Sequence, residues 1–150
     1  MTEKVFYQDS HKVSCEAEVL ACEPKGTQYL IALDRTVFFP EGGGQYADTG
    51  WIGEVRVTDA HEKEGVIWHT AEAAVPVGTK VTARIDWEER FEKMQQHTGE
   101  HIVSGLVHER FGYHNVGFHL GSDYCTMDFN GPIPREALKE IEWEANCAVW

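Results

Sequence analysis

The stretch Gln95-Gln96-His97-Thr98-Gly99-Glu100-His101-Ile102 contains two histidines that stand four positions apart. On an α-helix, side chains at positions i and i+4 lie on the same face, one above the other. Two imidazoles in this arrangement can bind one metal ion, and zinc accepts histidine nitrogens readily. The spacing therefore predicts a metal site at His97 and His101. The alternative is two histidines bonded to backbone carbonyls, because a metal ion needs more than two ligands.

The residues around this stretch carry the signals of one long helix. Asp86 is a candidate N-cap, and Glu89, three positions later, completes a capping-box-like start. Gly112 is a suitable C-terminal stop. The apolar residues between these limits spread over more than one stripe, so we expect the helix to be buried on several sides. Arg90 and His108 fall on the same stripe as the two histidines, which gives one edge of the helix polar, ligand-capable groups.

Residues 1–86 have the pattern of strands and turns. The segments that alternate or consist of β-forming residues are 13–20, 29–33, 36–39, 51–59, 66–70 and 80–85. Turn-forming residues at 24–26 and 76–78 separate several of them. Short strands at this spacing predict a small antiparallel barrel or sandwich.

The segment 39–50 interrupts this pattern with three consecutive glycines, Gly42, Gly43 and Gly44, followed by Gln45. Without Cβ atoms, the backbone N–H groups of such a loop can approach a ligand closely, or the loop can move. Gln45 offers both a hydrogen-bond donor and an acceptor. A ligand-facing loop and an ordinary hairpin turn are both open interpretations.

Beyond the helix, residues 115–130 alternate in two halves and predict a hairpin that turns at 121–123. Pro134 suits the first turn of a second helix, along which Leu138, Ile141, Ala145 and Ala148 recur at helical spacing. The sequence reaches Trp150 while still in helical pattern, which we interpret as a chain cut short of its next element.

The chain has 150 residues, 42% of them hydrophobic and 25% charged, which is typical of one globular domain or two small ones. Its formal net charge of −12 disfavours broad nucleic-acid binding but permits recognition of one RNA end in a pocket. There is no membrane-spanning run and no signal-peptide pattern, so we expect a cytoplasmic protein without a membrane partner. The four cysteines, Cys15, Cys22, Cys125 and Cys147, form no C-x-x-C pair and are expected to be free thiols.

Two stretches together resemble the editing domains of alanyl-tRNA synthetases. Residues 36–45, Thr-Val-Phe-Phe-Pro-Glu-Gly-Gly-Gly-Gln, with Asp-Thr-Gly at 48–50, are similar to the glycine-rich motif of that family. Residues 96–102, Gln-His-Thr-Gly-Glu-His-Ile, resemble its H-x-x-x-H motif, and residues 116–121 fit the strand that follows. Free-standing relatives called AlaX share this layout, and the resemblance covers nearly the whole chain.

The resemblance implies an α+β fold: a small antiparallel β-barrel with the glycine-rich loop in residues 1–86, then an α/β editing subdomain with the H-x-x-x-H helix in 87–150. It implies hydrolysis of the ester that joins a wrong serine or glycine to tRNA specific for alanine, in trans or as an editing-domain fragment. It also implies zinc, held by two histidines and a later C-x-x-x-H motif. ATP is not expected, because the chain leaves no room for a synthetase core.

Carried onto this sequence, the resemblance makes His97 and His101 zinc ligands. It places the loop formed by Gly42, Gly43, Gly44 and Gln45 near the aminoacylated end of the RNA. The C-x-x-x-H motif is absent, because no cysteine of this chain is followed by a histidine four positions later. In the family this motif follows the helix on which the chain stops, so we interpret the second subdomain as truncated at its C-terminal end.

Other residues are candidates for the remaining roles. Cys125 or His119 is a candidate third ligand from the predicted hairpin, although a packed thiol is the alternative for Cys125. His119 is also a candidate catalytic base or RNA contact, against a satisfied or solvent-facing histidine. Thr36, Gln45 and His119 are candidates to recognise the serine hydroxyl, with an ordinary strand former as the alternative for Thr36.

We therefore expect a zinc-dependent aminoacyl-tRNA deacylase that acts on seryl- or glycyl-tRNA specific for alanine, with Gln45 and His119 as catalytic candidates. The alternative is a non-catalytic module that keeps the fold, lacks half of the metal site and binds tRNA ends or a protein. A third hypothesis is that a partner chain completes the site.

Overall fold

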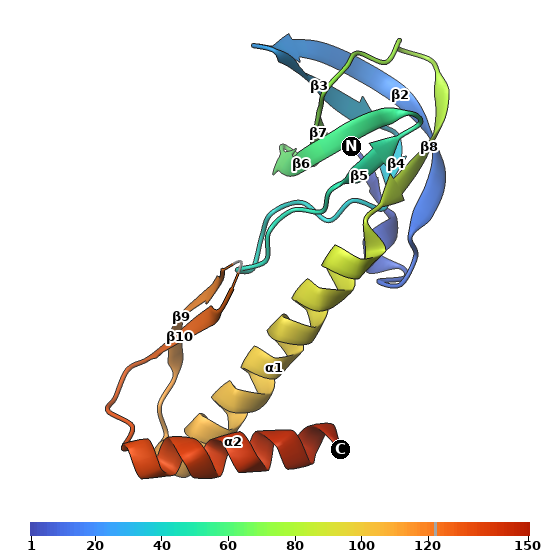
Figure 1. Ribbon diagram of the computed structural model, residues 1–150. Coiled ribbons are helices and arrows are strands. Elements are labelled where there is room, and N and C mark those ends of the chain that lie inside the picture. The colour runs from blue at the N-terminus through green and yellow to red at the C-terminus, as the bar shows by residue number, and fades with distance from the viewer. Residues whose placement is uncertain (122) are drawn as a thin grey trace. The chain divides into compact units, whose positions relative to one another are not determined.

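The computed structural model describes residues 1–121 and 123–150. These residues form two compact units, Met1–Phe91 and Glu92–Trp150, and helix α1 (Trp87–Phe111) starts in the first and continues in the second (Figure 1). A large antiparallel sheet and two helices make this a mixed α+β fold, as the sequence predicts.

The first unit is built on one closed antiparallel sheet. Its strands are β2 (Ser14–Lys25), β3 (Gln28–Leu33), β5 (Gly50–Ile52), β6 (Val55–Lys63), β7 (Val66–Ala71) and β8 (Lys80–Ile85). They pair in the order β2-β3-β7-β6-β5-β8, and β8 also pairs with β2, so each strand has two neighbours and the sheet closes as a barrel. A short parallel pair, β1 (Glu3–Lys4) with β4 (Arg35–Thr36), and the 3-10 turn η1 (Val5–Tyr7) complete the unit.

Two strand predictions need correction. The segment 36–39 is not a full strand, because β4 ends at Thr36 and the chain then leads into the glycine-rich loop. The segment 51–59 is two strands, since Gly53 has a φ of +59° and permits a tight turn between β5 and β6. The predicted hairpin turn at 121–123 includes Ser122, which lies outside the described residues.

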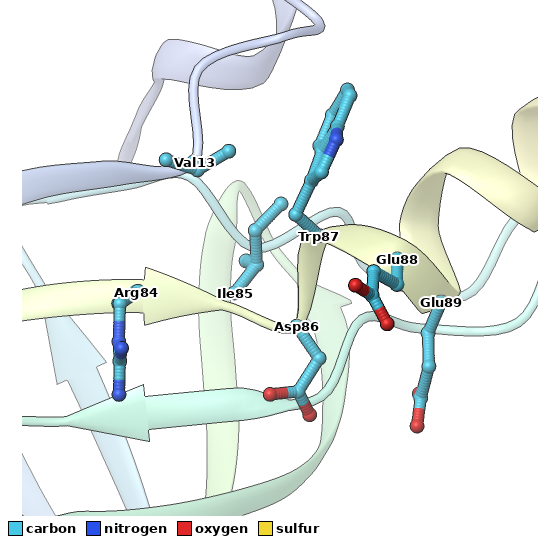
Figure 2. A pocket seen from close by; sticks show the side chains of 7 residues that line it. All are labelled: Val13, Arg84, Ile85, Asp86, Trp87, Glu88 and Glu89. Atoms are coloured by element: carbon cyan, nitrogen blue, oxygen red, sulfur yellow. The ribbon is translucent and has the colours of Figure 1, made fainter.

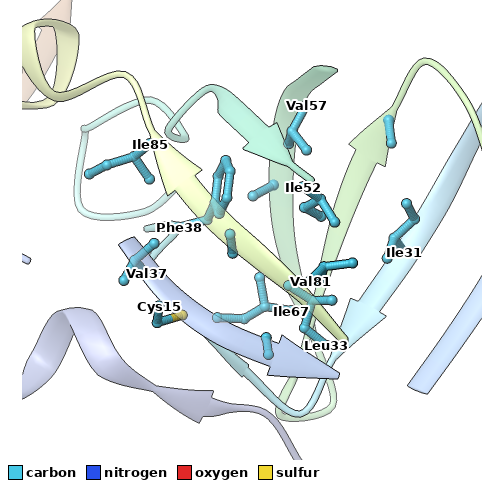
Figure 3. Packing of buried hydrophobic residues seen from close by; sticks show 14 of the residues in the cluster. Cys15, Ile31, Leu33, Val37, Phe38, Ile52, Val57, Ile67, Val81 and Ile85 are labelled. Carbon is cyan, nitrogen blue, oxygen red and sulfur yellow. The ribbon is translucent and has the colours of Figure 1, made fainter. Parts of the chain in front are cut away.

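Alternation of side chains fills the barrel. Along β2, Cys15, Ala17 and Val19 are buried whereas the intervening glutamates are exposed, which is the two-residue period of a half-buried strand. The interior is aliphatic with one central aromatic ring, Phe38, and the largest buried side chains around it include Ile31, Leu33, Ile52, Ile67 and Val57 (Figure 3).

The second unit consists of most of α1, the hairpin β9 (Asn115–Leu120) and β10 (Cys125–Phe129), and helix α2 (Arg135–Val149). The limits of α1 agree with the predicted start after Asp86 and stop at Gly112, whose φ is +70°. The expectation that α1 is buried on several sides is wrong. Its buried residues are Arg90, Glu100 and Val107, whereas apolar residues such as Ile102, Val103 and Leu106 are only half-buried.

No helix in the described part of the chain is long and apolar enough to cross a membrane.

Candidate metal centre and glycine-rich loop

His97 and His101 lie one turn apart on α1 and face each other. Their ring centroids are 5.0 Å apart and the ring planes differ by 16°, so the two imidazoles are stacked. The His101 side chain is 73% exposed, which leaves its ring accessible from solvent. The i, i+4 spacing has thus produced the pair of neighbouring rings that a shared metal ion requires.

Glu100 joins the two histidines, and sequence reasoning missed it. The ligand atoms of His97, Glu100 and His101 all lie within 4.8 Å of one another. The signal was present in the spacing, because Glu100 stands three positions after His97 and so falls on the same helical face. Two histidines with a carboxylate beside them are donor types that zinc sites use. The residues present therefore fit a zinc ion.

The Glu100 carboxylate is held by a small polar network. Glu100 is 7% exposed, and its Oε1 accepts hydrogen bonds from Ser104 Oγ at 2.6 Å and from Asn115 Nδ2 at 2.8 Å. Asn115 in turn accepts a hydrogen bond at Oδ1 from the Gly117 backbone N–H at 2.9 Å. The other carboxylate oxygen, Oε2, lies 3.4 Å from His101 Nδ1. Helix α1 and strand β9 thus fix this carboxylate together.

The candidate third ligands from the hairpin lie elsewhere. Cys125 Sγ donates a hydrogen bond to Gln96 Oε1 at 3.3 Å, and among the described residues it does not belong to the group of converging ligand atoms. His119 is exposed on β9 opposite Thr126 and is likewise outside that group. The hairpin does reach the histidines through Phe118, whose ring centroid lies 5.6 Å from that of His97.

The glycine run forms a tight turn in the first unit. The backbone N–H and C=O groups of Gly42 and Gln45 bond each other at 3.1 and 3.0 Å. Gly43 and Gly44 between them have φ values of +60° and +82°, the signs that a type I′ turn requires at both central positions. The two central glycines are exposed, whereas the Gln45 side chain is 7% exposed.

A buried ion pair between Arg90 and Asp48 holds the chain on either side of this loop. Arg90 and Asp48 are 3% and 1% exposed, and Arg90 Nε lies 2.9 Å from each Asp48 carboxylate oxygen. Arg90 also donates to the carbonyl oxygens of Val37 at 2.7 Å and Ser10 at 3.0 Å, while Asp48 accepts the Phe39 N–H at 2.7 Å. Arg90 shares the predicted stripe with the histidines, but it anchors the loop and is not aimed at a metal.

Thr36, a predicted substrate-binding residue, lies against His69 in the barrel unit. Thr36 and His69 are both 0% exposed, and Thr36 Oγ1 lies 2.8 Å from His69 Nε2. His69 Nδ1 lies 2.8 Å from the Ile31 carbonyl oxygen, which can only accept, so Nδ1 carries the proton and the Thr36 hydroxyl donates to Nε2. Burial lowers the pKa of His69 to about 4. Thr36 is thus part of the barrel interior.

A surface hollow at the start of α1 includes none of the predicted site residues (Figure 2). It is lined by Val13, Arg84, Ile85, Asp86, Trp87, Glu88 and Glu89. The Asp86 carboxylate is already engaged by Arg56 Nη2 at 2.7 Å and Thr49 Oγ1 at 2.6 Å, and the hydrogen bond from Arg56 is the main reason why its pKa is lowered. Three acidic residues and one basic residue, Arg84, line this hollow, so its lining disfavours phosphate.

Comparison with known proteins identifies the family that this chain resembles. Residues 2–89 match the family model described as tRNA synthetases class II (A). Over 99% of its length the chain is 34% identical to the alanyl-tRNA editing protein AlaX-L of Pyrococcus horikoshii. It is 37% identical to the alanine–tRNA ligase of Pyrococcus furiosus over 99% of its length, and 34% identical to the alanyl-tRNA editing protein Aarsd1-A of Xenopus laevis over 91%.

These relatives are much longer than this chain. It spans 39% of the AlaX-L protein, 35% of Aarsd1-A and 17% of the ligase. The similarity extends through both units, since the aligned share of this chain includes the helix with His97 and His101 as well as the barrel.

Proposed function

Because this chain belongs to the alanyl-tRNA synthetase editing-domain family, within the class II (A) tRNA synthetases, we propose that it acts in tRNA editing as an aminoacyl-tRNA deacylase. Its substrates are seryl- or glycyl-tRNA specific for alanine, bound at the aminoacylated end. The chain acts in trans or as the editing part of a larger protein. The names of its relatives support the editing role, and the substrates are those that the family resemblance implies.

The logic of alanine selection is physical. An alanine pocket in a synthetase cannot firmly exclude glycine, which is smaller, and an apolar pocket discriminates only weakly against an added hydroxyl. A second, hydrolytic site therefore removes the errors that the first site makes. The formal net charge of −12 disfavours broad contact with the RNA backbone but permits recognition of one RNA end.

One observation carries the proposal: two histidines and a buried carboxylate converge within 4.8 Å on one face of α1. In this proposal His97 and His101 hold a zinc ion through ring nitrogens. A bound zinc ion would supply Lewis acidity toward the ester carbonyl. Glu100 lies against the pair and keeps negative charge next to it.

Other residues bind and orient the substrate. The backbone N–H groups of the Gly42–Gly44 turn approach the aminoacylated end, and Gln45 orients the ester or its hydroxyl. His119, exposed on β9, accepts or delivers a proton or contacts the RNA. Thr36 is a further candidate to recognise the serine hydroxyl, and its own hydroxyl bonds to His69 inside the barrel unit.

A second candidate function is favoured by one feature of the sequence. Within the 150 residues, His97 and His101 are the positions that match the ligand motifs that the family resemblance implies. A module of this kind would bind tRNA ends or a protein without hydrolysing an ester. It would take up zinc weakly, because two histidines alone do not hold the ion firmly.

Hydrolysis of seryl-tRNA specific for alanine separates the two functions. The chain is assayed with added zinc and again with a chelator, alongside titration of bound zinc. Zinc-dependent release of serine with about one tightly bound ion per chain supports the deacylase. Binding of the tRNA without release and without tight zinc supports the module. Activity per molecule that falls on dilution would point to a partner chain completing the site.

A further inference from the structure

Within the metal centre, the two oxygens of the Glu100 carboxylate have different surroundings. Oε1 accepts two hydrogen bonds from neutral donors, Ser104 Oγ at 2.6 Å and Asn115 Nδ2 at 2.8 Å. Oε2 points to His101 Nδ1 at 3.4 Å. A carboxylate that is 7% exposed and fixed from two elements has little freedom to swing toward a metal ion.

We propose that Glu100 is a positioning residue for His101 rather than a zinc ligand: its Oε2 accepts the His101 Nδ1–H and so leaves Nε2 to bind the metal. This proposal rests on the proposed zinc site at His97 and His101. Metal-binding histidines commonly donate their second ring N–H to a carboxylate, which fixes the tautomer and orients the ring. A carboxylate can only accept, so a hydrogen bond to it requires the proton on Nδ1.

The distance between Glu100 Oε2 and His101 Nδ1 is 3.4 Å, which is longer than the usual hydrogen-bond range of 2.7–3.2 Å. The proposal therefore requires a small rotation of the exposed His101 ring to form the bond. Contacts in metal-binding and catalytic sites are often loose before the ligand arrives and tighten when it binds. Glu100 itself needs no rearrangement, because Ser104 and Asn115 already hold it.

The network also determines what an isosteric change would do. The Asn115 side-chain oxygen accepts the Gly117 N–H, so its NH2 group must face Glu100. In Glu100→Gln the amide oxygen therefore stays toward Asn115, and the new NH2 group turns toward His101. An NH2 group next to Nδ1 requires Nδ1 to accept, which places the ring proton on Nε2, the atom needed for the metal.

NMR of ¹⁵N-histidine-labelled chain tests this in the metal-free state, and zinc affinity is measured separately by competition with a chelator. The wild-type chain should show His101 as the Nδ1–H tautomer. Glu100→Gln should shift His101 to Nε2–H and lower zinc affinity by about 10- to 100-fold. Ser104→Ala keeps the carboxylate and should preserve the tautomer. Glu109→Gln, which replaces an exposed glutamate on the same helix, should change neither the His101 tautomer nor the zinc affinity.

Three results would overturn the proposal. The first is a wild-type His101 that carries its proton on Nε2, and the second is a tautomer that Glu100→Gln leaves unchanged. The third is a much larger loss of zinc affinity, of about 1,000-fold or more, with the tautomer preserved, which would make Glu100 a direct ligand. Failure of the wild-type chain to bind zinc would instead refute the zinc site, since the tautomer is read without metal.

Discussion

The two units of the molecule bury different kinds of side chain. In the barrel unit the interior is aliphatic, and its buried polar groups, such as the Thr36–His69 pair and the Asp48–Arg90 pair, satisfy one another. In the unit after residue 91, the buried hydrophobic residues of the described chain are Val107, Leu120 and Ile141, while large apolar side chains on α2 stay exposed.

Against that background, Glu100 is unusual. A unit with so small a core nevertheless buries a carboxylate and surrounds it with two hydrogen-bond donors. Burying a charge costs free energy unless it is compensated, so such a group is better explained by the histidines beside it than by stability. The buried polar groups of the barrel unit thus pair with one another, whereas the buried carboxylate of the second unit lies beside a histidine.

The largest expected effect tests the second unit. His97→Ala combined with His101→Ala should abolish tight zinc binding and reduce deacylation to background, because both proposed ligands are lost. Circular dichroism should show the barrel intact, since its core lies in other elements. Zinc titration and seryl-tRNA hydrolysis measure the outcome.

The chain offers a matched control for this variant. His108 and His114 are another exposed histidine pair in the same unit, with ring centroids 4.8 Å apart. Their replacement by alanine should leave zinc binding and hydrolysis near wild type. Equal losses in the two double variants would mean that His97 and His101 are not special ligands.

The next effect tests the barrel unit. Arg90→Met should lower the free energy of unfolding by about 3–5 kcal/mol, because it leaves the Asp48 carboxylate buried and unpaired. Arg35→Met removes an ion pair to Glu3 whose side chains are 47% and 44% exposed, and should cost about 1 kcal/mol or less. Denaturant unfolding of the three chains measures both values, and similar losses would contradict a stabilising role for the buried pair.

A third effect concerns pH and is again specific to the barrel. Burial lowers the pKa of His69 from 6.5 to about 4, so between these values the unfolded chain binds more protons. The contribution of His69 to the free energy of unfolding is therefore fully present above pH 6.5. It is lost as the pH falls toward 4, by up to about 3 kcal/mol.

Unfolding measured from pH 7 to pH 4.5 should show this loss in the wild-type chain. His69→Leu should have a lower free energy of unfolding at pH 7, because it leaves the Ile31 carbonyl and the Thr36 hydroxyl without their partner. Its free energy of unfolding should fall less than that of the wild-type chain on acidification. The same loss in both chains would mean that other groups account for the pH dependence.

The comparison of the units also shows what the sequence could reveal. Local patterns identified α1, its limits at Asp86 and Gly112, and the i, i+4 pair of histidines, since these depend on periodicity and capping. They did not reveal that Arg90 pairs with Asp48, because that partner is brought near only by tertiary packing. For Thr36, the sequence permits an ordinary strand former or a substrate contact, and it did not reveal the buried bond to His69, which also depends on tertiary packing.

Glu100 could have been found from its position beside His101 and three residues after His97, but its burial depends on Asn115 in a different element. The Gly53 turn was missed for a related reason. A single glycine inside an alternating pattern indicates either a bulge or a turn, and the sequence does not decide between them.

The smallest predicted effect asks whether the barrel unit contributes to chemistry at all. Gln45→Ala should slow deacylation by about tenfold, corresponding to about 1.4 kcal/mol of transition-state stabilisation, and should weaken tRNA binding less. Gln45 is 7% exposed beside an exposed glycine turn, so its side chain is held in one place rather than spread in solvent. Single-turnover hydrolysis and tRNA binding separate the two effects. Gln8→Ala, an exposed glutamine of the same unit, is the control and should leave both unchanged. Wild-type turnover in Gln45→Ala would mean that the glycine-rich loop is an ordinary hairpin turn. The groups that hydrolyse the ester would then lie in the second unit alone.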